Sequence, residues 1–402
     1  MLDIEDVRAA RERISDVVRE TPLDRSFGFS ERTGADVHLK LENFQRTGAF
    51  KIRGALNKVR LLSSGEREAG VVTASAGNHA QGVALAATTE GVDAKVVMPE
   101  QAPISKIKAT RGYGAEVVLA GADYDAAAEH AHRIEREEGR TYIHAFDDYD
   151  VMAGQGTIGL EIAEALPAVE TVVVPVGGGG LISGIATVMD SETDARVIGV
   201  QAEGASAVAE SLRKGERVER EQVDTIADGI AVRRTGEHTL PIIREHVDEV
   251  VTVTDAETAG ALVALLERSK TLVEGAGAVS LAALLERAFG FEDDETVVAA
   301  LCGGNIDLNV LTTVIMRGLV ESGRYLRLRT VLKDRPGALQ QLIDVIADAR
   351  ANIYAIQHDR TSRDIEMNAA DVKLDLETRG HEHVVELVDA LEAHGYEVDI
   401  LV

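Results

Sequence analysis

The sequence predicts an α/β protein with a second, smaller α/β module at its C-terminal end. Between residues 37 and 301, short apolar runs of strand length alternate with helical patterns, which is typical of a mostly parallel sheet with helices on both faces. From residue 325 on, the pattern changes to β-α-β-β-α-β, the split ferredoxin-like arrangement. We therefore expect one region over residues 1–320 and another over residues 325–402.

A first helix is expected over residues 4–18, where apolar side chains recur along one helical face, and Thr21-Pro22 should end it. The expected strands of the large region are short apolar runs, each followed by a helical segment: Val37–Leu41, Gly70–Thr73, Lys95–Met98, Ala115–Leu119, Thr141–His144, Thr171–Pro175, Arg196–Gln201 and Val297–Leu301. The C-terminal module is expected to consist of strand Tyr325–Leu332, turn Asp334–Gly337, helix Ala338–Ala349, strands Asn352–His358 and Ile365–Leu376, helix His381–Ala393 and strand Glu397–Val402.

The charge balance bears on partners and habitat. The chain has 68 acidic and 42 basic residues, a formal net charge of −26, and we expect neither nucleic acid nor an anionic membrane as a partner. Only ten lysines occur and tryptophan is absent. This composition resembles proteins of salt-loaded cytoplasms, where ions screen the self-repulsion, although an ordinary acidic enzyme is the alternative.

Cysteine use and the chain ends suggest a cytoplasmic protein. Cys302 is the only cysteine, which excludes an intrachain disulfide and a multi-thiol metal site. No apolar run has the length of a membrane span, and the acidic N-terminus lacks the layout of a secretory signal.

Two motifs in the first quarter of the chain contain residues that could carry out chemistry or bind a ligand. Residues 47–55 read TGAFKIRGA, and an amine such as Lys51 at a helix start can form a Schiff base with an aldehyde, although most lysines are solvated surface residues. Residues 75–82 read SAGNHAQG, directly after a strand and opening a helix. Free N–H groups there could bind a carboxylate or phosphate, and Asn78 adds a donor. The alternative is a capped turn in which His79 is structural.

Two further motifs follow later strands. Residues 176–181 read VGGGGL, and four successive glycines let N–H groups converge on an oxyanion. The pattern is neither a dinucleotide fingerprint nor a nucleotide loop, so it favours a single phosphate over a flexible turn. Residues 301–307 read LCGGNID. Cys302 is there either a small buried hydrophobe or a neutral partner for a ring nitrogen.

Taken together, these motifs closely resemble threonine dehydratases (threonine ammonia-lyases), which are fold-type II pyridoxal-phosphate enzymes. The resemblance covers residues 4–319 and includes KLE at 40–42, AGQGT at 153–157, ADG at 227–229 and VEGAGA at 273–278. The run DRPGAL at 334–339 resembles an ACT domain, a small amino-acid-sensing module.

The resemblance implies two open, mostly parallel sheets, with a smaller subdomain of about residues 50–150 inserted in the larger one, and pyridoxal 5′-phosphate as cofactor. Lys51 would hold the cofactor and act as catalytic base. The implied cofactor contacts are Phe50 on the ring, Asn78 on the ring hydroxyl, Gly177, Gly178, Gly179, Gly180 and the Leu181 amide on the phosphate, and Cys302 on the ring nitrogen. The implied substrate contacts are Ser75, Ala76, Asn78, His79 and Gln155.

The implied reaction is β-elimination of water from L-threonine, giving 2-oxobutanoate and ammonia, with side activity on L-serine. Serine racemases resemble this chain but carry a second serine where Ala76 stands, as a base for the opposite face, so Ala76 favours the lyase. They also bind a divalent metal. Glu203 matches a ligand of that site, but Ala209 replaces the acidic residue, and no metal is expected.

Two other functions stay open. One is a serine racemase or serine dehydratase, and the other is an amino-acid-binding regulatory protein with a dead catalytic fold, which should have lost Lys51 or its glycine loop. The ACT resemblance implies allosteric control, with isoleucine or valine as effector, in keeping with isoleucine biosynthesis. The effector would lie between paired modules near Asp334, Gly337 and Asn352, in a homodimer or homotetramer. An assembly domain without an effector is the alternative.

Overall fold

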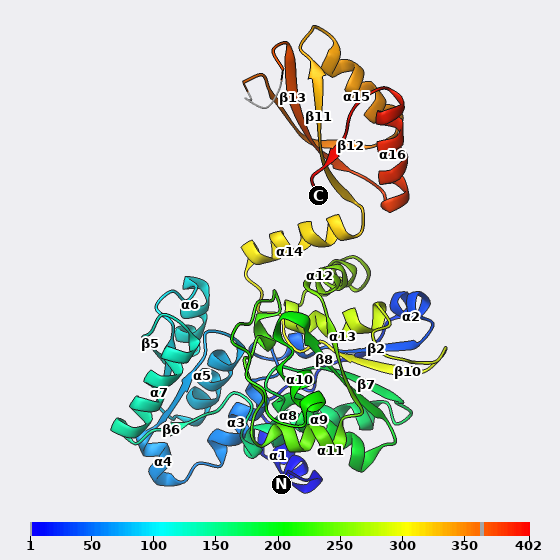
Figure 1. Ribbon diagram of the computed structural model, residues 1–402. Helices are drawn as coiled ribbons and strands as arrows, with labels where there is room; N and C mark the ends of the chain where they lie inside the picture. Colours follow the sequence, from blue (N-terminus) through cyan, green and yellow to red (C-terminus); the bar gives the residue numbers. More distant parts are fainter. Residues whose placement is uncertain (1, 362–365) are drawn as a thin grey trace. The chain divides into compact units, whose positions relative to one another are not determined.

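The computed structural model describes residues 2–361 and 366–402, and it confirms the predicted α/β class (Figure 1). The chain forms two compact units, residues 1–311 and residues 312–402, and their boundary lies within helix α14 (Leu308–Glu321). Among the described residues, no helix is long and apolar enough to span a membrane.

The first unit contains two sheets. The larger has the order β1-β2-β10-β7-β8-β9, and all neighbours are parallel except β1 and β2. Its strands are β1 (Leu23–Arg25), β2 (Asp36–Lys40), β7 (Thr171–Pro175), β8 (Arg196–Ala202), β9 (Glu249–Val253) and β10 (Thr296–Ala300). The smaller sheet is parallel throughout and has the order β5-β4-β3-β6. Its strands are β3 (Val71–Ala74), β4 (Ala94–Met98), β5 (Glu116–Leu119) and β6 (Thr141–Tyr142).

Helices cover these sheets and connect their strands (Figure 1). The α-helices are α1 (Ile4–Ile14), α2 (Phe27–Thr33), α3 (Ile52–Arg60), α4 (Ser64–Ala69), α5 (Asn78–Glu90), α6 (Ile104–Gly112), α7 (Tyr124–Glu138), α8 (Tyr149–Ala165), α9 (Gly180–Glu192), α10 (Ala207–Lys214), α11 (Thr239–His246), α12 (Asp255–Ala264) and α13 (Gly275–Leu285). Short 3-10 turns lie at η1 (Glu42–Phe44), η2 (Glu203–Ala205) and η3 (Asp228–Ile230), and a π turn at η4 (Leu265–Ser269). The first helix ends at Ile14, four residues before the predicted end, and a turn follows in which Val17 and Val18 both donate to the Ile14 carbonyl.

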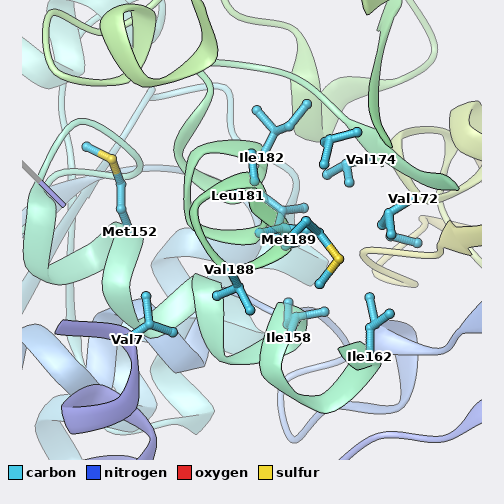
Figure 2. Packing of buried hydrophobic residues seen from close by; sticks show 14 of the residues in the cluster. Val7, Met152, Ile158, Ile162, Val172, Val174, Leu181, Ile182, Val188 and Met189 are labelled. Atoms are coloured by element: carbon cyan, nitrogen blue, oxygen red, sulfur yellow. The ribbon is translucent and has the colours of Figure 1, made fainter. Parts of the chain in front are cut away.

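The core of the larger sheet fixes helix α9. Figure 2 shows apolar side chains of α8 and α9, among them Ile158 and Val188, packed beside side chains of β7 such as Val174. The two helices approach closely because glycines face each other: a Cβ at Gly184 would lie 2.4 Å from the Met152 carbonyl oxygen. Helix α9 begins at Gly180, shortly after β7 ends at Pro175, and this packing holds the helix against the sheet.

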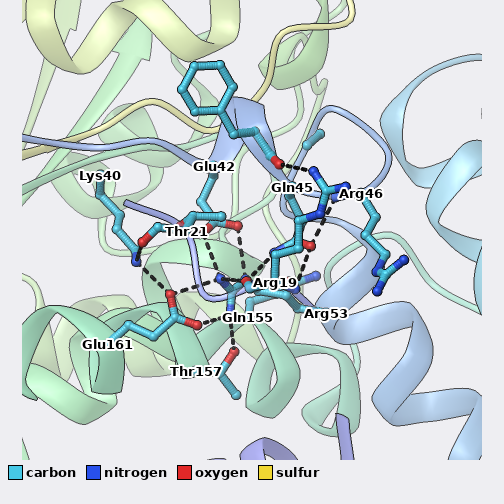
Figure 3. A network of polar contacts seen from close by, with 12 residues as sticks. Arg19, Thr21, Lys40, Glu42, Gln45, Arg46, Arg53, Gln155, Thr157 and Glu161 are labelled. Carbon is cyan, nitrogen blue, oxygen red and sulfur yellow. Dashed lines mark hydrogen bonds and ion pairs between the residues drawn. The ribbon is translucent and has the colours of Figure 1, made fainter. Parts of the chain in front are cut away.

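A buried network of charged side chains anchors helix α3 (Figure 3). The Arg53 guanidinium donates to both oxygens of Glu42, at 2.8 and 2.9 Å, and to both oxygens of Glu161, at 2.6 and 3.0 Å. Lys40 donates to Glu161 at 2.5 Å, and Thr21 donates to Glu42 at 2.5 Å. Burial lowers the pKa of Arg53, but the two carboxylates outweigh it and raise that pKa above its usual value. The network therefore holds two cations and two anions in balance beneath the N-terminus of α3.

The second unit has the predicted β-α-β-β-α-β order. Its antiparallel sheet has the order β12-β13-β11-β14. The elements are β11 (Tyr325–Lys333), α15 (Ala338–Asp348), β12 (Asn352–Asp359), β13 (Ala369–Glu377), α16 (His381–Ala393) and β14 (Asp399–Ile400). The predicted start of the third strand, Ile365, lies outside the described residues.

Candidate active site

A cavity of about 1240 Å³ opens where strands β3, β7 and β10 end. Parallel strands present their carboxyl ends at one edge of a sheet, and the loops after them form the usual ligand site of such folds. The cavity lining brings together most of the residues predicted from the sequence: Phe50, Lys51, Ser75, Ala76, Asn78, His79, Gly177, Gly178, Gly179, Gly180, Leu181 and Cys302.

Lys51 lies in the cavity wall at the N-cap position of α3. Its Nζ donates to the Ala145 carbonyl at 2.8 Å and lies 5.0 Å from the centre of the Phe50 ring. Burial lowers the pKa of Lys51 to about 8, although the negative charge of Glu274 opposes this shift. About a tenth of this amine is therefore uncharged at pH 7, as a nucleophile toward an aldehyde or a proton acceptor must be.

The asparagine motif forms the N-terminus of helix α5. Gly77 supplies the N-cap position without a side chain, and its N–H donates to the Ser75 hydroxyl at 3.1 Å. The helix N-terminus carries a partial positive charge and amide donors, so it can hold a carboxylate or phosphate. Asn78 and Ala76 are both partly exposed to the cavity.

His79 contributes its backbone rather than its ring to this loop. The side chain is buried, and its Nε2 donates to the Ile143 carbonyl at 2.9 Å. Burial, with a smaller effect from Lys51, lowers the pKa of His79 to about 3. A neutral imidazole has one proton, and here Ile143 accepts it, so the ring cannot also donate to a substrate carboxylate.

The glycine run forms a cradle that side chains would fill. A Cβ at Gly178 would lie 2.3 Å from the Phe146 ring, and one at Gly180 would lie 2.7 Å from the Phe146 carbonyl oxygen. Gly179 has a φ of +100°, in the left-handed region that favours glycine. Because helix α9 begins at Gly180, the cradle combines clustered backbone amides with a helix N-terminus. This arrangement fits a phosphate group.

Cys302 follows β10 and is buried in the cavity wall. Its Sγ lies 3.8 Å from the Ala300 carbonyl oxygen. Burial raises the pKa of Cys302 well above its usual value, so the group is a neutral thiol. Such a thiol can face a ring nitrogen but cannot keep it protonated as a carboxylate would.

Gln155, a predicted substrate contact, is not among the residues that line the cavity. It lies buried within α8, where its Oε1 accepts from the Gly54 N–H at 3.2 Å. Gly54 has no Cβ, and a Cβ there would lie 2.4 Å from the Gln155 Nε2. The amide therefore packs against helix α3, and its contact with the substrate stays a prediction.

Other lining residues carried no prediction of a role. Phe146 abuts the cradle, Glu274 accepts a hydrogen bond from Asn78 Nδ2 at 2.6 Å, and Asn305 donates to Asn78 Oδ1 at 2.6 Å. Glu274 and Asn305 lie in motifs that the sequence singles out, VEGAGA and LCGGNID. Phe146 lies in neither and had no sequence signal.

The expected effector residues lie apart within one C-terminal module. Lys333, just before Asp334, pairs with Ala369 of β13, whereas Asn352 pairs with Glu377 at the other end of that strand. Eight residues of strand correspond to about 26 Å. Asp334 forms an ion pair with Arg360 at 3.1 Å, Asn352 donates to Glu377 at 3.1 Å, and Gly337 has a φ of +86° before α15.

The described part of the chain contains no cluster of three or more histidine, cysteine or carboxylate side chains that could hold a metal ion. Glu203 lies in η2, and Ala209 lies in α10, where its N–H donates to the Gln201 side chain at 2.9 Å.

Comparison with known proteins places the chain in a family. A model described as pyridoxal-phosphate dependent enzyme matches residues 14–303, and one described as ACT domain matches residues 324–394. The chain therefore belongs to the pyridoxal-phosphate dependent enzymes, in a form with a C-terminal ACT domain. This confirms the family resemblance, the cofactor and the fold predicted from the sequence.

Within that family, the chain is similar to lyases. It is 51% identical to an L-threonine ammonia-lyase of Geobacter sulfurreducens over 98% of both chains, and 47% identical to one of Thermotoga maritima over the full length of both. Among solved structures, threonine deaminase isoform 2 of Solanum lycopersicum matches with a TM-score of 0.75 and 39% identity, over 78% of this chain and 94% of that one. A maize serine racemase matches with a TM-score of 0.74 and 35% identity, over 79% and 98%.

Proposed function

We propose that the protein is a threonine ammonia-lyase, which converts L-threonine to 2-oxobutanoate and ammonia by β-elimination of water and acts more slowly on L-serine. The observation that carries this proposal is the cavity, where the amine of Lys51, with its pKa lowered to about 8, faces a glycine cradle, a helix N-terminus and a neutral thiol. The names of the full-length relatives support threonine as the substrate.

The cavity residues fit pyridoxal 5′-phosphate. When bound through Lys51, the cofactor supplies an electron sink for negative charge at the α-carbon. Gly177, Gly178, Gly179, Gly180 and the Leu181 amide would hold its phosphate, Asn78 its ring hydroxyl, Cys302 its ring nitrogen and Phe50 its ring. The cradle supports this assignment, because its backbone amides adjoin the N-terminus of α9, which begins at Gly180.

The other groups of the cavity have separate proposed roles in the reaction. The backbone amides of the loop with Ser75, Ala76, Asn78 and His79 would hold the substrate carboxylate at the start of α5. Lys51, once displaced by the substrate amine, would take the α-proton as general base. Burial keeps Cys302 a neutral thiol, which would leave the ring nitrogen of the cofactor unprotonated and would favour loss of the β-hydroxyl.

Ala76 distinguishes the lyase from its main competitor, a serine racemase. Removal and return of a proton on opposite faces of the α-carbon needs two proton-transfer groups. Ala76 has no hydroxyl, and His79 is neutral, with its proton donated to Ile143. Lys51 is therefore the proposed base on one face, and racemisation lacks its expected partner.

The C-terminal module is proposed to regulate the enzyme. We infer residues 1–320 as the catalytic region and residues 325–402 as an ACT module that binds isoleucine or valine between paired copies, in a homodimer or homotetramer that serves isoleucine biosynthesis. The separation of Asp334 and Asn352 within one module supports a site built from two. The excess of acidic residues supports a salt-adapted enzyme, and the single cysteine is in keeping with a cytoplasmic one.

An oxo-acid release assay tests the proposal. The cofactor-loaded protein is given L-threonine, L-serine or D-serine at high and low salt, with and without isoleucine or valine. We expect the highest turnover on L-threonine, activity that depends on salt, and no D-serine formed from L-serine. Lys51→Ala should abolish turnover and the absorbance of the bound cofactor, whereas Lys58→Ala on the same helix should keep both. Absence of oxo acid from either L-substrate would contradict the lyase assignment.

A further inference from the structure

Glu274 is a partly buried glutamate in the cavity lining that the proposed reaction does not use. It occupies the N-cap position of α13. Its N–H donates to the Gly303 carbonyl at 3.0 Å, and its own carbonyl accepts from the Gly277 N–H at 2.9 Å. Both sides of its peptide backbone are thus held, which limits where the side chain can lie.

Two glycines make room for the carboxylate. A Cβ at Gly303 would lie 2.6 Å from Glu274 Oε1, and a Cβ at Gly229 would lie 2.9 Å from the same atom. Side chains at these positions would displace the carboxylate, because a real Cβ atom does not come this close to an oxygen. Glu274 therefore lies in a narrow slot with its position fixed by packing.

In this slot, Glu274 is the last acceptor in a series of hydrogen bonds that runs through the side-chain amides of Asn305 and Asn78. Asn305 Nδ2 donates to the Thr47 carbonyl at 2.7 Å and to Asn78 Oδ1 at 2.6 Å. Asn78 Nδ2 in turn donates to Glu274 Oε1 at 2.6 Å. A carbonyl at one end and a carboxylate at the other only accept, so the direction of every bond between them is determined.

This chain determines which way the Asn78 amide faces. Its oxygen is bound by Asn305, one hydrogen of its Nδ2 is bound by Glu274, and the second hydrogen remains for the cavity. We propose that Glu274 is a positioning residue for the cofactor: it holds Asn78 with an N–H presented to the ring hydroxyl of pyridoxal phosphate.

The groups around Glu274 indicate that its carboxylate is a partner of Asn78 rather than of the Lys51 amine. The charged or titratable groups that face it are Lys51 before α3, Lys106 on α6, Asp228 in η3 and Cys302 after β10. Burial raises the pKa of Glu274, while the hydrogen bond from Asn78 and the charge of Lys106 lower it. Lys51 donates instead to Ala145, and burial lowers the pKa of its amine to about 8.

The inference rests on the proposed function only for the identity of the bound cofactor. It is therefore tested by cofactor binding, which needs no turnover. Cofactor-stripped protein is titrated with pyridoxal 5′-phosphate, and the absorbance of the bound form gives the dissociation constant. The variants are Asn78→Ala, Glu274→Met, the double variant and Glu274→Gln. The matched control is Glu286→Ala, an exposed glutamate at the other end of α13.

We expect Asn78→Ala and Glu274→Met each to weaken cofactor binding about tenfold, the effect of losing one well-placed hydrogen bond. The double variant should be no weaker than either single one, because both changes remove the same N–H contact. Glu274→Gln should stay within about threefold of the unmodified protein, since its amide oxygen can accept from Asn78. The absorption maximum of the bound cofactor should shift in the same direction in the Asn78→Ala and Glu274→Met variants.

Two results would overturn the inference. One is unchanged cofactor affinity in Glu274→Met, and the other is a double variant weaker by the product of the two single effects. A role in folding alone would lower the thermal midpoint of the apoprotein without this non-additivity. If the unmodified protein binds the cofactor but releases no oxo acid, the proposed function fails while the inference about Glu274 stands on its own result.

Discussion

The buried network around Arg53 predicts a large loss of stability on a single substitution. Arg53 and Glu42 each have 1% of their side chain exposed, and the guanidinium donates four hydrogen bonds to Glu42 and Glu161. In Arg53→Met, Glu161 keeps Lys40 as a partner, but Glu42 loses its guanidinium and keeps the Thr21 hydroxyl. Removing one partner of a buried ion pair costs about 3–5 kcal/mol, because the remaining charge is uncompensated.

Urea denaturation at a fixed protein concentration, followed by far-UV circular dichroism, measures this change in the free energy of unfolding. We expect Arg53→Met to lose about 3–5 kcal/mol of unfolding free energy. The stability of Arg53→Lys should lie between those of Arg53→Met and the unmodified protein, because one ammonium nitrogen replaces the three nitrogens of the guanidinium. Adding Glu42→Gln to Arg53→Met should restore at least about 1 kcal/mol by removing the stranded charge. Arg11→Met, which breaks an exposed ion pair with Glu164, serves as the control and should change stability little.

The reasoning would be refuted if Arg53→Met stayed within about 1 kcal/mol of the unmodified protein. It would also be refuted if Glu42→Gln gave no recovery in the Arg53→Met background. Either result would mean that solvent or rearranged side chains compensate the carboxylates, and that the network does not anchor α3.

Three further predictions concern the cavity. The rate of pyridoxal phosphate capture by the apoprotein should rise about tenfold per pH unit below pH 8 and level off above it, because burial lowers the pKa of Lys51 to about 8 and only the neutral amine reacts. Stopped-flow absorbance measures this rate, and a rate still rising steeply at pH 10 would contradict the prediction. Gly178→Ala should weaken cofactor binding about tenfold or more, because the new Cβ would lie 2.3 Å from the Phe146 ring, whereas Gly65→Ala, which meets no atom within 4 Å, should not. Ala76→Ser should allow D-serine to form from L-serine, as chiral chromatography would detect; continued absence of D-serine would show that a hydroxyl there is not sufficient.

Much of the fold followed from patterns that are local in the chain. The strands at residues 171–175 and 196–202 are apolar runs because both faces of a parallel sheet are buried, and such runs are visible without a structure. The strands β1 and β9 were missed for the opposite reason. β1 is only Leu23–Arg25, and β9 is a partly exposed edge strand that includes Glu249. Their backbone pairing depends on the neighbouring strands rather than on their own residues.

Parts of the site were predictable because their chemistry depends on backbone conformation. The glycine run reserves the left-handed φ of Gly179 and the space against Phe146, and the motif at residues 75–82 begins a helix directly after a strand. The structure brings both motifs into the cavity that contains Lys51. The roles assigned to these residues stay predictions until cofactor and substrate binding are measured.

The sequence by itself determined the α/β class, the β-α-β-β-α-β module and the set of motifs that identify the cofactor, because each is a pattern over neighbouring residues. Only the tertiary structure decided which side chains meet. It joined Asn78 to Glu274 and Asn305, 196 and 227 residues away, and it turned Gln155 toward Gly54 instead of the cavity. The physical reason is that these contacts form where separate strands and helices pack together, and packing depends on the space left by distant glycines as much as on the residues in contact.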